Sequence, residues 1–178
     1  MNALVAMSDQ SSSGVGAVAF GGTLTAFFGV DLGRDPQLSV SNGRAFMIAR
    51  DTDTVFELSR ECGEPMCRWS TRREGRATNP QDVAAAPDGS LWIPRFNEAT
   101  VAVIDREGRE ARTIALPDLD GDGNPNASAI RIVTVGGAAK AFVSLGLLEF
   151  QDAQHPFRSL RPSEIGRASC RERVLASV

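Results

Sequence analysis

An internal repeat constrains this chain more than any other feature of its sequence. Residues 43–61 align without a gap on residues 89–107, so that Phe46 meets Trp92, and Phe142 opens the same pattern in a third unit. Self-similarity at about 40 to 50 residues is typical of folds in which each unit covers its neighbour. We therefore expect a repeat fold in which these three aromatic side chains pack between units.

Short apolar runs separated by turn residues make up each unit, which favours strands over helices. In the central unit, Pro87-Asp88-Gly89-Ser90 combines a residue of fixed φ with a glycine that accepts positive φ, so a hairpin is expected there. Four strands in one period are typical of a propeller blade, so we predict an all-β partial β-propeller with about three and a half four-stranded blades. The expected strands are residues 82–86, 91–95, 100–105 and 111–115 of the central unit, residues 130–135 and 140–145 of the next, and residues 3–9 and 14–18 as the second half of an earlier unit.

Charge and hydropathy exclude several classes of function. The formal net charge is −3 and basic residues form no continuous run, so the sequence lacks the positive patch that nucleic acids or anionic lipids bind. No apolar stretch reaches the roughly 18 residues that a membrane-spanning helix needs, so no span is expected. The single histidine is His155, which nearly excludes a Ser-His-Asp or Cys-His catalytic set within these residues.

The C-terminal segment differs in character from the repeat. Residues 164–174 resemble, residue for residue, the conceptual translation of a common sequencing-library adapter, and a short amphipathic helix is the alternative. Segments of such origin are set aside before a fold is inferred. We therefore expect a partial propeller domain at residues 1–163 and an adapter-derived tail at residues 164–178, with both ends being truncations of a longer protein.

Three motifs lie in and beside the repeat units: Asn79-Pro-Gln-Asp-Val, Pro87-Asp-Gly-Ser-Leu-Trp-Ile-Pro-Arg-Phe-Asn and Asp120-Gly-Asp-Gly-Asn-Pro. Together they resemble a group of bacterial extracytoplasmic β-propeller proteins, often lipoproteins, over about residues 4–148. The Asp-Gly-Ser-Leu-Trp core is also similar to NHL-type and streptogramin-lyase-type propellers. The resemblance implies about six or seven blades in the family, within the usual range for propellers. It also implies export on a leader peptide to the periplasm or the cell surface.

Cys62 and Cys67 flank the short segment Gly-Glu-Pro-Met. Zinc would need a second pair of Cys or His ligands, which the sequence lacks, so a metal half-site is improbable, whereas two reduced thiols are a simple alternative. The resemblance to exported propellers implies a disulfide between Cys62 and Cys67, because oxidising compartments preserve such bonds.

The segment from Asp118 to Asn124 places oxygen-bearing side chains at alternate positions, as the first half of an EF-hand calcium loop does. Ala129 stands where that loop needs a bidentate Glu. The alternative is a solvated connection between blades, because Asp, Asn and Gly favour turns for local reasons. The sequence thus suggests no certain cofactor and one weak Ca²⁺ candidate, formed by Asp118, Asp120, Asp122 and Asn124.

Arg95, Asn97 and Arg131 are the candidate ligand-face residues, because the loops of repeat folds carry function, and a solvated rim is the alternative for all three. We expect a non-enzymatic extracytoplasmic binding or scaffold module for an unknown protein or small molecule. The alternative is a metal-assisted lyase or lactonase whose catalytic residues lie in blades outside this chain. An incomplete propeller also leaves strand edges and blade faces uncovered, so we expect marginal stability and self-association or aggregation.

Overall fold

The computed structural model describes residues 2–28, 32–58, 67–119, 121–146, 148–149, 158–159 and 173–177, and of residues 2, 24–28, 149, 158–159 and 173–177 it describes the backbone alone. This part of the chain consists of antiparallel strands with one short 3₁₀ helix, η1 (Arg50–Thr52). None of its helical structure is long and apolar enough to cross a membrane.

Four antiparallel sheets follow one another along the chain, and a small two-stranded ladder accompanies the last. The first sheet contains β1 (Asn2–Ser8), β2 (Ser13–Ala19) and β3 (Leu24–Phe28), and the second contains β4 (Pro36–Ser41), β5 (Arg44–Ala49), β6 (Thr54–Glu57) and β7 (Arg68–Ser70). The third contains β8 (Ala84–Ala85), β9 (Leu91–Arg95), β10 (Thr100–Ile104) and β11 (Glu110–Ala115). The fourth contains β12 (Ala127–Val135), β13 (Ala138–Leu145) and β16 (Arg173–Ser177), and the ladder joins β14 (Leu148–Glu149) to β15 (Arg158–Ser159).

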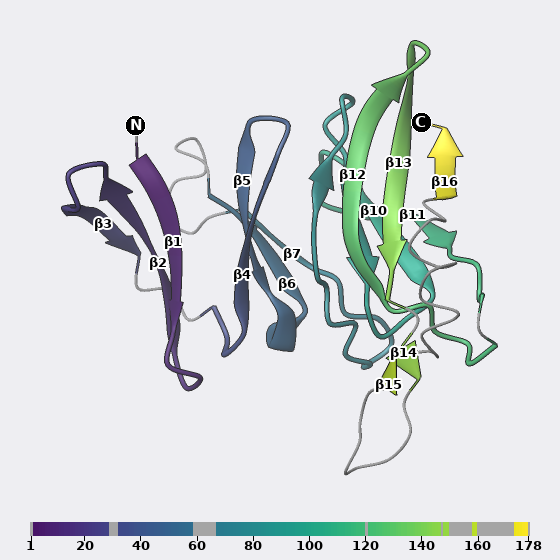
Figure 1. The fold of residues 1–178 in the computed structure, drawn as a ribbon, viewed down its shortest axis with the longest axis horizontal. Helices are drawn as coiled ribbons and strands as arrows, with labels where there is room; N and C mark the ends of the chain where they lie inside the picture. Colours follow the sequence, from purple (N-terminus) through teal and green to yellow (C-terminus); the bar gives the residue numbers. More distant parts are fainter. Residues whose placement is uncertain are drawn as a thin grey trace.

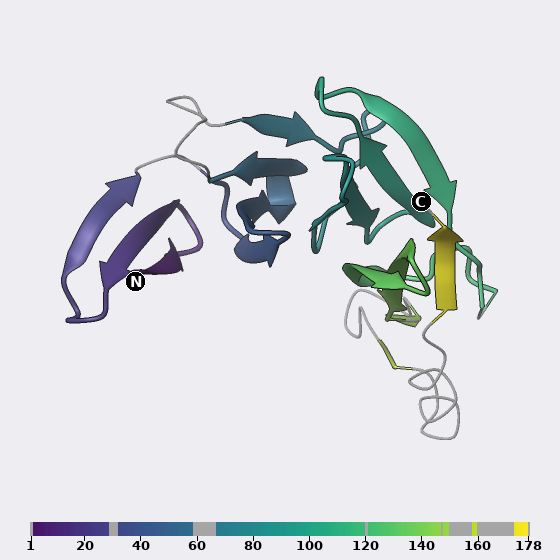
Figure 2. The same ribbon diagram turned by 90° about the horizontal axis from the view of Figure 1, so that it is seen from above.

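The four sheets stand side by side in an arc (Figures 1 and 2). On its inner side β4 contacts both β1 and β8, and β8 contacts β12. Strands β3, β7 and β11 lie at the convex side in Figure 2. Consecutive antiparallel strands that run outward from an axis, sheet after sheet, are the architecture of a propeller, so the predicted all-β partial β-propeller is confirmed.

The second and third sheets reproduce the sequence repeat in their strand register. Met47 lies opposite Phe56, and Ile93, which is 46 positions after Met47, lies opposite Ala102. The hairpin before each of these strand pairs needs residues with positive φ, and Gly89 supplies one at φ 88°. The gapless alignment therefore describes two units with the same backbone geometry.

The first sheet consists of later strands of a unit, as the sequence predicts. The β1–β2 turn lies at the lower edge in Figure 1, where β14 follows β13, whereas the β12–β13 hairpin lies at the upper edge. The Ser8 hydroxyl at the end of β1 donates to the carbonyl of Arg34, just before β4, at 2.7 Å. Strand β1 therefore runs in the direction of β5 and β13, the second strands of their sheets.

Each interface between neighbouring sheets has its own apolar core. Phe46 is fully buried against Ala85 and Ile93 of the third sheet, and Trp92 packs against Ala127 and Ala141 of the fourth. The prediction that the recurring aromatic residues pack between units is confirmed at these two positions. A third core, between the first and second sheets, is formed by Val15, Leu32, Met47, Ala49 and Phe56.

Phe142 holds the equivalent position in β13 but is only half-buried. It lines a groove of about 440 Å³ on the outer face of the fourth sheet, together with Arg131 and Val133. Val133 is 45% exposed. Among the described residues no further sheet covers this face, which is where a next sheet would pack.

Candidate ligand-binding face

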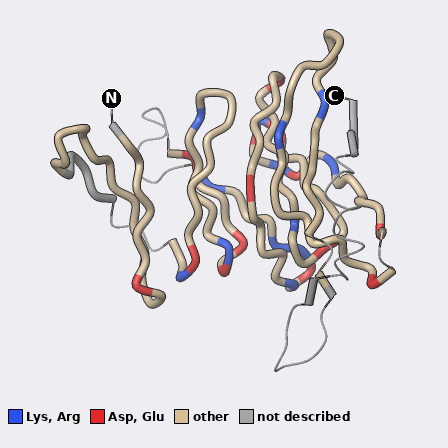
Figure 3. The backbone as a smooth tube through the Cα atoms, in the orientation of Figure 1, with Lys and Arg blue, Asp and Glu red and all other residues tan. Residues whose placement is uncertain are grey.

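Turns and connections from successive sheets meet at the lower edge of the molecule in Figure 1, which we call the loop edge. It comprises the β5–β6 turn (50–53), the β9–β10 turn (96–99) and the connections 71–83 and 116–126. The backbone N–H of Asn97 donates to the carbonyl of Thr78 at 3.1 Å, so the second turn is fixed to the first connection. Figure 3 shows basic and acidic residues side by side along this edge.

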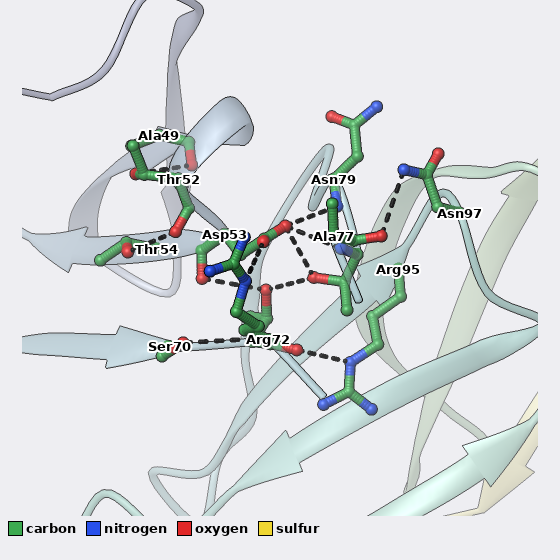
Figure 4. Close-up of polar contacts among 12 residues, drawn as sticks. Ala49, Thr52, Asp53, Thr54, Ser70, Arg72, Ala77, Asn79, Arg95 and Asn97 are labelled. Atoms are coloured by element: carbon green, nitrogen blue, oxygen red, sulfur yellow. Dashed lines mark hydrogen bonds and ion pairs between the residues drawn. The ribbon is translucent and has the colours of Figure 1, made fainter. Parts of the chain in front are cut away.

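A buried carboxylate organises the loop edge between the second and third sheets (Figure 4). Asp53 is fully buried and has φ 56°, a left-handed conformation that Asp tolerates better than most residues. Its Oδ1 accepts from the backbone N–H groups of Thr78 at 2.7 Å and Asn79 at 2.9 Å. The Nε of Arg72 lies 3.3 Å from Oδ2 as an ion pair. Asp53 therefore fixes the β5–β6 turn to the next connection.

Arg95 ends β9 and is fully buried, although it was a candidate for ligand contact. Its Nε donates to the carbonyl of Thr71 at 3.1 Å, and its Nη2 and Nη1 donate to Glu110 at 2.6 and 3.2 Å. Burial opposes ionisation of Glu110, but the hydrogen bonds from Arg95 and Thr113 outweigh it and hold the pKa of Glu110 below its usual range. The guanidinium of Arg95 is thus engaged within the protein.

A second buried acid joins three sheets nearer the axis. Asp82 precedes β8, and its Oδ1 accepts from the hydroxyl of Ser39 in β4 at 2.7 Å. Its Oδ2 accepts from the backbone N–H of Ile130 in β12 at 3.0 Å and from the guanidinium of Arg131. Arg131 is therefore tied to the third sheet while most of its side chain is exposed.

The loop edge contains an open polar pocket of about 360 Å³, a volume within the usual range for small-molecule sites. Asn97 belongs to it, so one of the three candidate ligand-face residues lines a pocket at this edge. Arg95 is buried just before the same turn, whereas Arg131 lies on the fourth sheet. The lining residues are Arg73, Glu74, Arg76, Asn97, Glu98, Ala99 and Gly123.

Sequence reasoning missed Asp53, Arg73 and Arg76. Asp53 lies inside an ordinary turn sequence, and its burial depends on a connection about 25 residues further along, which no local pattern reveals. The arginines carried a local signal, because Arg73-Glu74-Gly75-Arg76 places two like charges across a two-residue turn. Like charges in directly opposed positions repel each other, so this arrangement needs an explanation beyond folding.

The candidate calcium segment forms local turns. The Asp118 carboxylate accepts from the backbone N–H of Gly121 at 2.8 Å and Gly123 at 3.2 Å, and that of Asp122 accepts from Asn124 at 2.8 Å. Asp120 lies outside the described residues. Within the described ranges, no three Asp, Glu, Cys or His side chains gather as ligands for one metal ion.

Cys67 is disulfide-bonded. Cys62, its predicted partner, lies outside the described residues, as do Cys170 and His155. The pairing of Cys62 with Cys67 therefore stays a prediction.

Comparison with protein-family models finds no match, and comparison with curated proteins finds none either. Among solved structures, virginiamycin B lyase from Staphylococcus aureus superposes with a TM-score of 0.57 at 13% identity, over 82% of this chain and 47% of that chain. Regucalcin, a calcium-binding protein from Agrobacterium tumefaciens, superposes with a TM-score of 0.51 at 14% identity, over 92% of this chain and 51% of that chain. The extracellular domain of a hybrid two-component system from B. thetaiotaomicron superposes with a TM-score of 0.55 at 12% identity, over 88% of this chain and 20% of that chain.

Identities of this size establish a common fold and nothing finer. The chain spans about half the length of the lyase and of regucalcin, at 47% and 51%. Its stacked antiparallel sheets and these superpositions agree, and the chain has the fold of part of a β-propeller.

Proposed function

We propose that this chain is a non-enzymatic, extracytoplasmic binding module of a propeller protein, and that its ligand lies at the loop edge. The observation that carries the proposal is that buried side chains fix the loops of this edge while an open pocket beside them has polar walls. Asp53 and Arg95 are used to hold the loops together, beside an open pocket with polar walls. Fixed loops around a pocket favour binding, because a ligand need not order them first.

The disulfide of Cys67 supports the extracytoplasmic part of this proposal, since disulfides persist mainly in oxidising compartments. One of the structural neighbours is an extracellular domain, in agreement with such a location. A bacterial source and anchoring as a lipoprotein at the cell surface belong to the proposal through the sequence resemblance.

The proposal separates binding from turnover and is tested on both. Thermal shift against a panel of sugar acids, amino acids and short peptides identifies ligands of the intact chain. Mass spectrometry of each ligand after prolonged incubation then detects any change in mass. We expect at least one ligand to raise the unfolding temperature and to remain unchanged. A ligand that the purified chain converts would overturn the non-enzymatic assignment.

A metal-assisted lyase is the second candidate, favoured by the structural likeness to virginiamycin B lyase. Its test is incubation with virginiamycin B and a divalent metal, followed by mass spectrometry. We expect the antibiotic to stay intact, as in a control with heat-denatured protein. Conversion that requires the folded chain would favour the enzyme.

A further inference from the structure

We propose that the pocket at the loop edge binds an oxyanion, the carboxylate or phosphate group of a polar ligand, between Arg73 and Arg76. This inference rests on the proposed binding function and names the chemistry of its ligand.

Backbone geometry sets the two arginines against each other. Arg73 and Arg76 form an antiparallel bridge, and the backbone N–H of Arg76 donates to the carbonyl of Arg73 at 2.8 Å. Glu74 and Gly75, both with positive φ, make the tight turn between them. Directly opposed residues of such a bridge carry their side chains on one face, with Cβ atoms about 5 Å apart. Both arginines line the pocket, so this turn brings two positive charges to its wall.

Their charge has no direct partner in the described part of the chain, where neither side chain makes an ion pair or a hydrogen bond. The neighbouring Arg72, in contrast, pairs with Asp53. Burial raises the pKa of Glu110, and Arg73 helps to lower it electrostatically, after the larger effects of Arg95 and Thr113, but that carboxylate is already held by Arg95. A bound anion would relieve the repulsion between the two arginines, and guanidinium groups match the two oxygens of a carboxylate or phosphate.

The other walls of the pocket supply hydrogen-bond acceptors. The Asn97 amide nitrogen donates to the carbonyl of Ala77 at 3.3 Å, which leaves its oxygen as an acceptor. Glu74 and Glu98 add carboxylates, and Glu98 also accepts from the Thr100 hydroxyl at 3.3 Å. The ligand that matches these groups carries an oxyanion at one end and hydroxyl or amino donors at the other.

The test is calorimetric titration of the full chain with three probes: inorganic phosphate, acetate and galacturonate, a sugar acid. The variant R73A/R76A is compared with R34A/R68A, which removes two exposed arginines outside the pocket and makes the same change in net charge. We expect R73A/R76A to weaken binding of at least one probe by about tenfold or more, as the loss of charge-assisted bonds implies, and R34A/R68A to change it little. We also expect that affinity to fall as NaCl rises, since the pocket is open to solvent.

The probes separate the two sources of the anion. Tighter binding of galacturonate than of acetate assigns a carboxylate ligand with hydroxyl donors, and a preference for phosphate assigns a phosphorylated one. Equal loss of affinity in both double variants would overturn the inference, because it would show a non-specific charge effect. Absence of binding by every probe would overturn it as well. If an uncharged ligand from the thermal-shift panel bound both variants equally, the oxyanion site would be wrong and the proposed binding function would stand. Chemical conversion of a probe would instead overturn the proposed non-enzymatic function alone.

Discussion

The second and third sheets share one backbone register but stabilise it with different polar groups. Arg44 and Glu57 form an ion pair at 2.7 Å in the second sheet, and the residues 46 positions later are Ser90 and Val103. The third sheet instead uses Arg95, which stands where the second has Ala49. Apolar positions are thus common to the units because each must cover its neighbour, whereas the ion pairs differ from sheet to sheet.

The arginines that lie over the two buried aromatic rings differ in the same way between the second and third sheets. Arg44 lies over Phe46 and Arg112 over Trp92, each with its guanidinium carbon 5.2 Å from the ring centroid. Arg44 comes from β5, two positions before Phe46, and Arg112 comes from β11, two strands away from Trp92 in the same sheet. The two cation–π contacts have the same distance, but the arginine comes from a different strand of the sheet in each unit.

Truncation of the aromatic residues tests the apolar half of this comparison and has the largest expected effect. Trp92→Ala leaves a cavity between the third and fourth sheets and should cost about 3–5 kcal/mol of unfolding free energy. Phe142→Ala at the equivalent position should cost about 1 kcal/mol, because the half-buried Phe142 side chain has fewer contacts to lose than Trp92 has. Urea denaturation measures both, with Phe20→Ala, at a 79% exposed residue, as control. Equal costs at Trp92 and Phe142 would contradict the assignment of an uncovered face.

The difference in ion pairs between the second and third sheets is tested at the buried Arg95. Arg95→Met should cost about 3 kcal/mol, because it leaves the Glu110 carboxylate and the Thr71 carbonyl without their donor. Arg44→Met should cost about 1 kcal/mol, since that ion pair is partly exposed. The double variant R95M/E110L should recover part of the loss, which a double-mutant cycle by urea denaturation detects. An Arg95→Met variant as stable as Arg44→Met would show that burial does not make the Arg95–Glu110 ion pair contribute more to stability than the Arg44–Glu57 ion pair.

These two halves also explain what the sequence could and could not predict. Apolar alternation and the Gly89 turn are local, so strands, register and the burial of Phe46 and Trp92 followed from the repeat. Arg95 was predicted at the end of a strand as a ligand-face candidate, and the sequence did not reveal its burial, because its partners Thr71 and Glu110 lie 24 and 15 positions away.

The pocket needed the same long-range information. Asn97 lines the pocket, and its role in ligand contact stays a prediction, whereas Arg73 reaches the same pocket from a separate connection of the chain. Polar networks depend on which loops meet in space, and a single sequence without its fold does not state this.

The outer face of the fourth sheet, unlike the faces between the other sheets, has no described sheet packed on it. Phe142 and Val133 line a groove there, and an uncovered apolar face favours the self-association that the sequence predicts. Phe142→Asp should weaken self-association by about tenfold, which corresponds to about 1.4 kcal/mol. Sedimentation over a concentration series measures this, with Phe20→Asp as the matched control. A wild-type chain that stays monomeric throughout would show that this face needs no cover.

Acid should weaken the third sheet through Glu110. Because the pKa of Glu110 is lowered in the folded state, its contribution to stability is present above its unfolded pKa of about 4.3 and is lost as the pH falls through the folded value. Urea denaturation from neutral pH to about pH 3 should therefore show a smaller acid loss in R95M/E110L than in the wild type. An identical pH profile would mean that other carboxylates, such as Asp88, whose pKa the Ser90 hydroxyl lowers, account for the acid sensitivity.

The connection after the third sheet should show the smallest effect, in its response to Ca²⁺. Asp118 and Asp122 already accept backbone N–H bonds within their own turn, so a cation would have to compete with them. We expect calorimetric titration with Ca²⁺ to give no heat beyond dilution and no difference between the wild type and Asp122→Asn. Saturable heat below millimolar Ca²⁺ that Asp122→Asn abolishes would instead show that this connection binds the ion and that Asp122 is one of its ligands. The polar contacts of this connection would then include a metal ion, whereas no three possible metal ligands gather in the described residues of the preceding units.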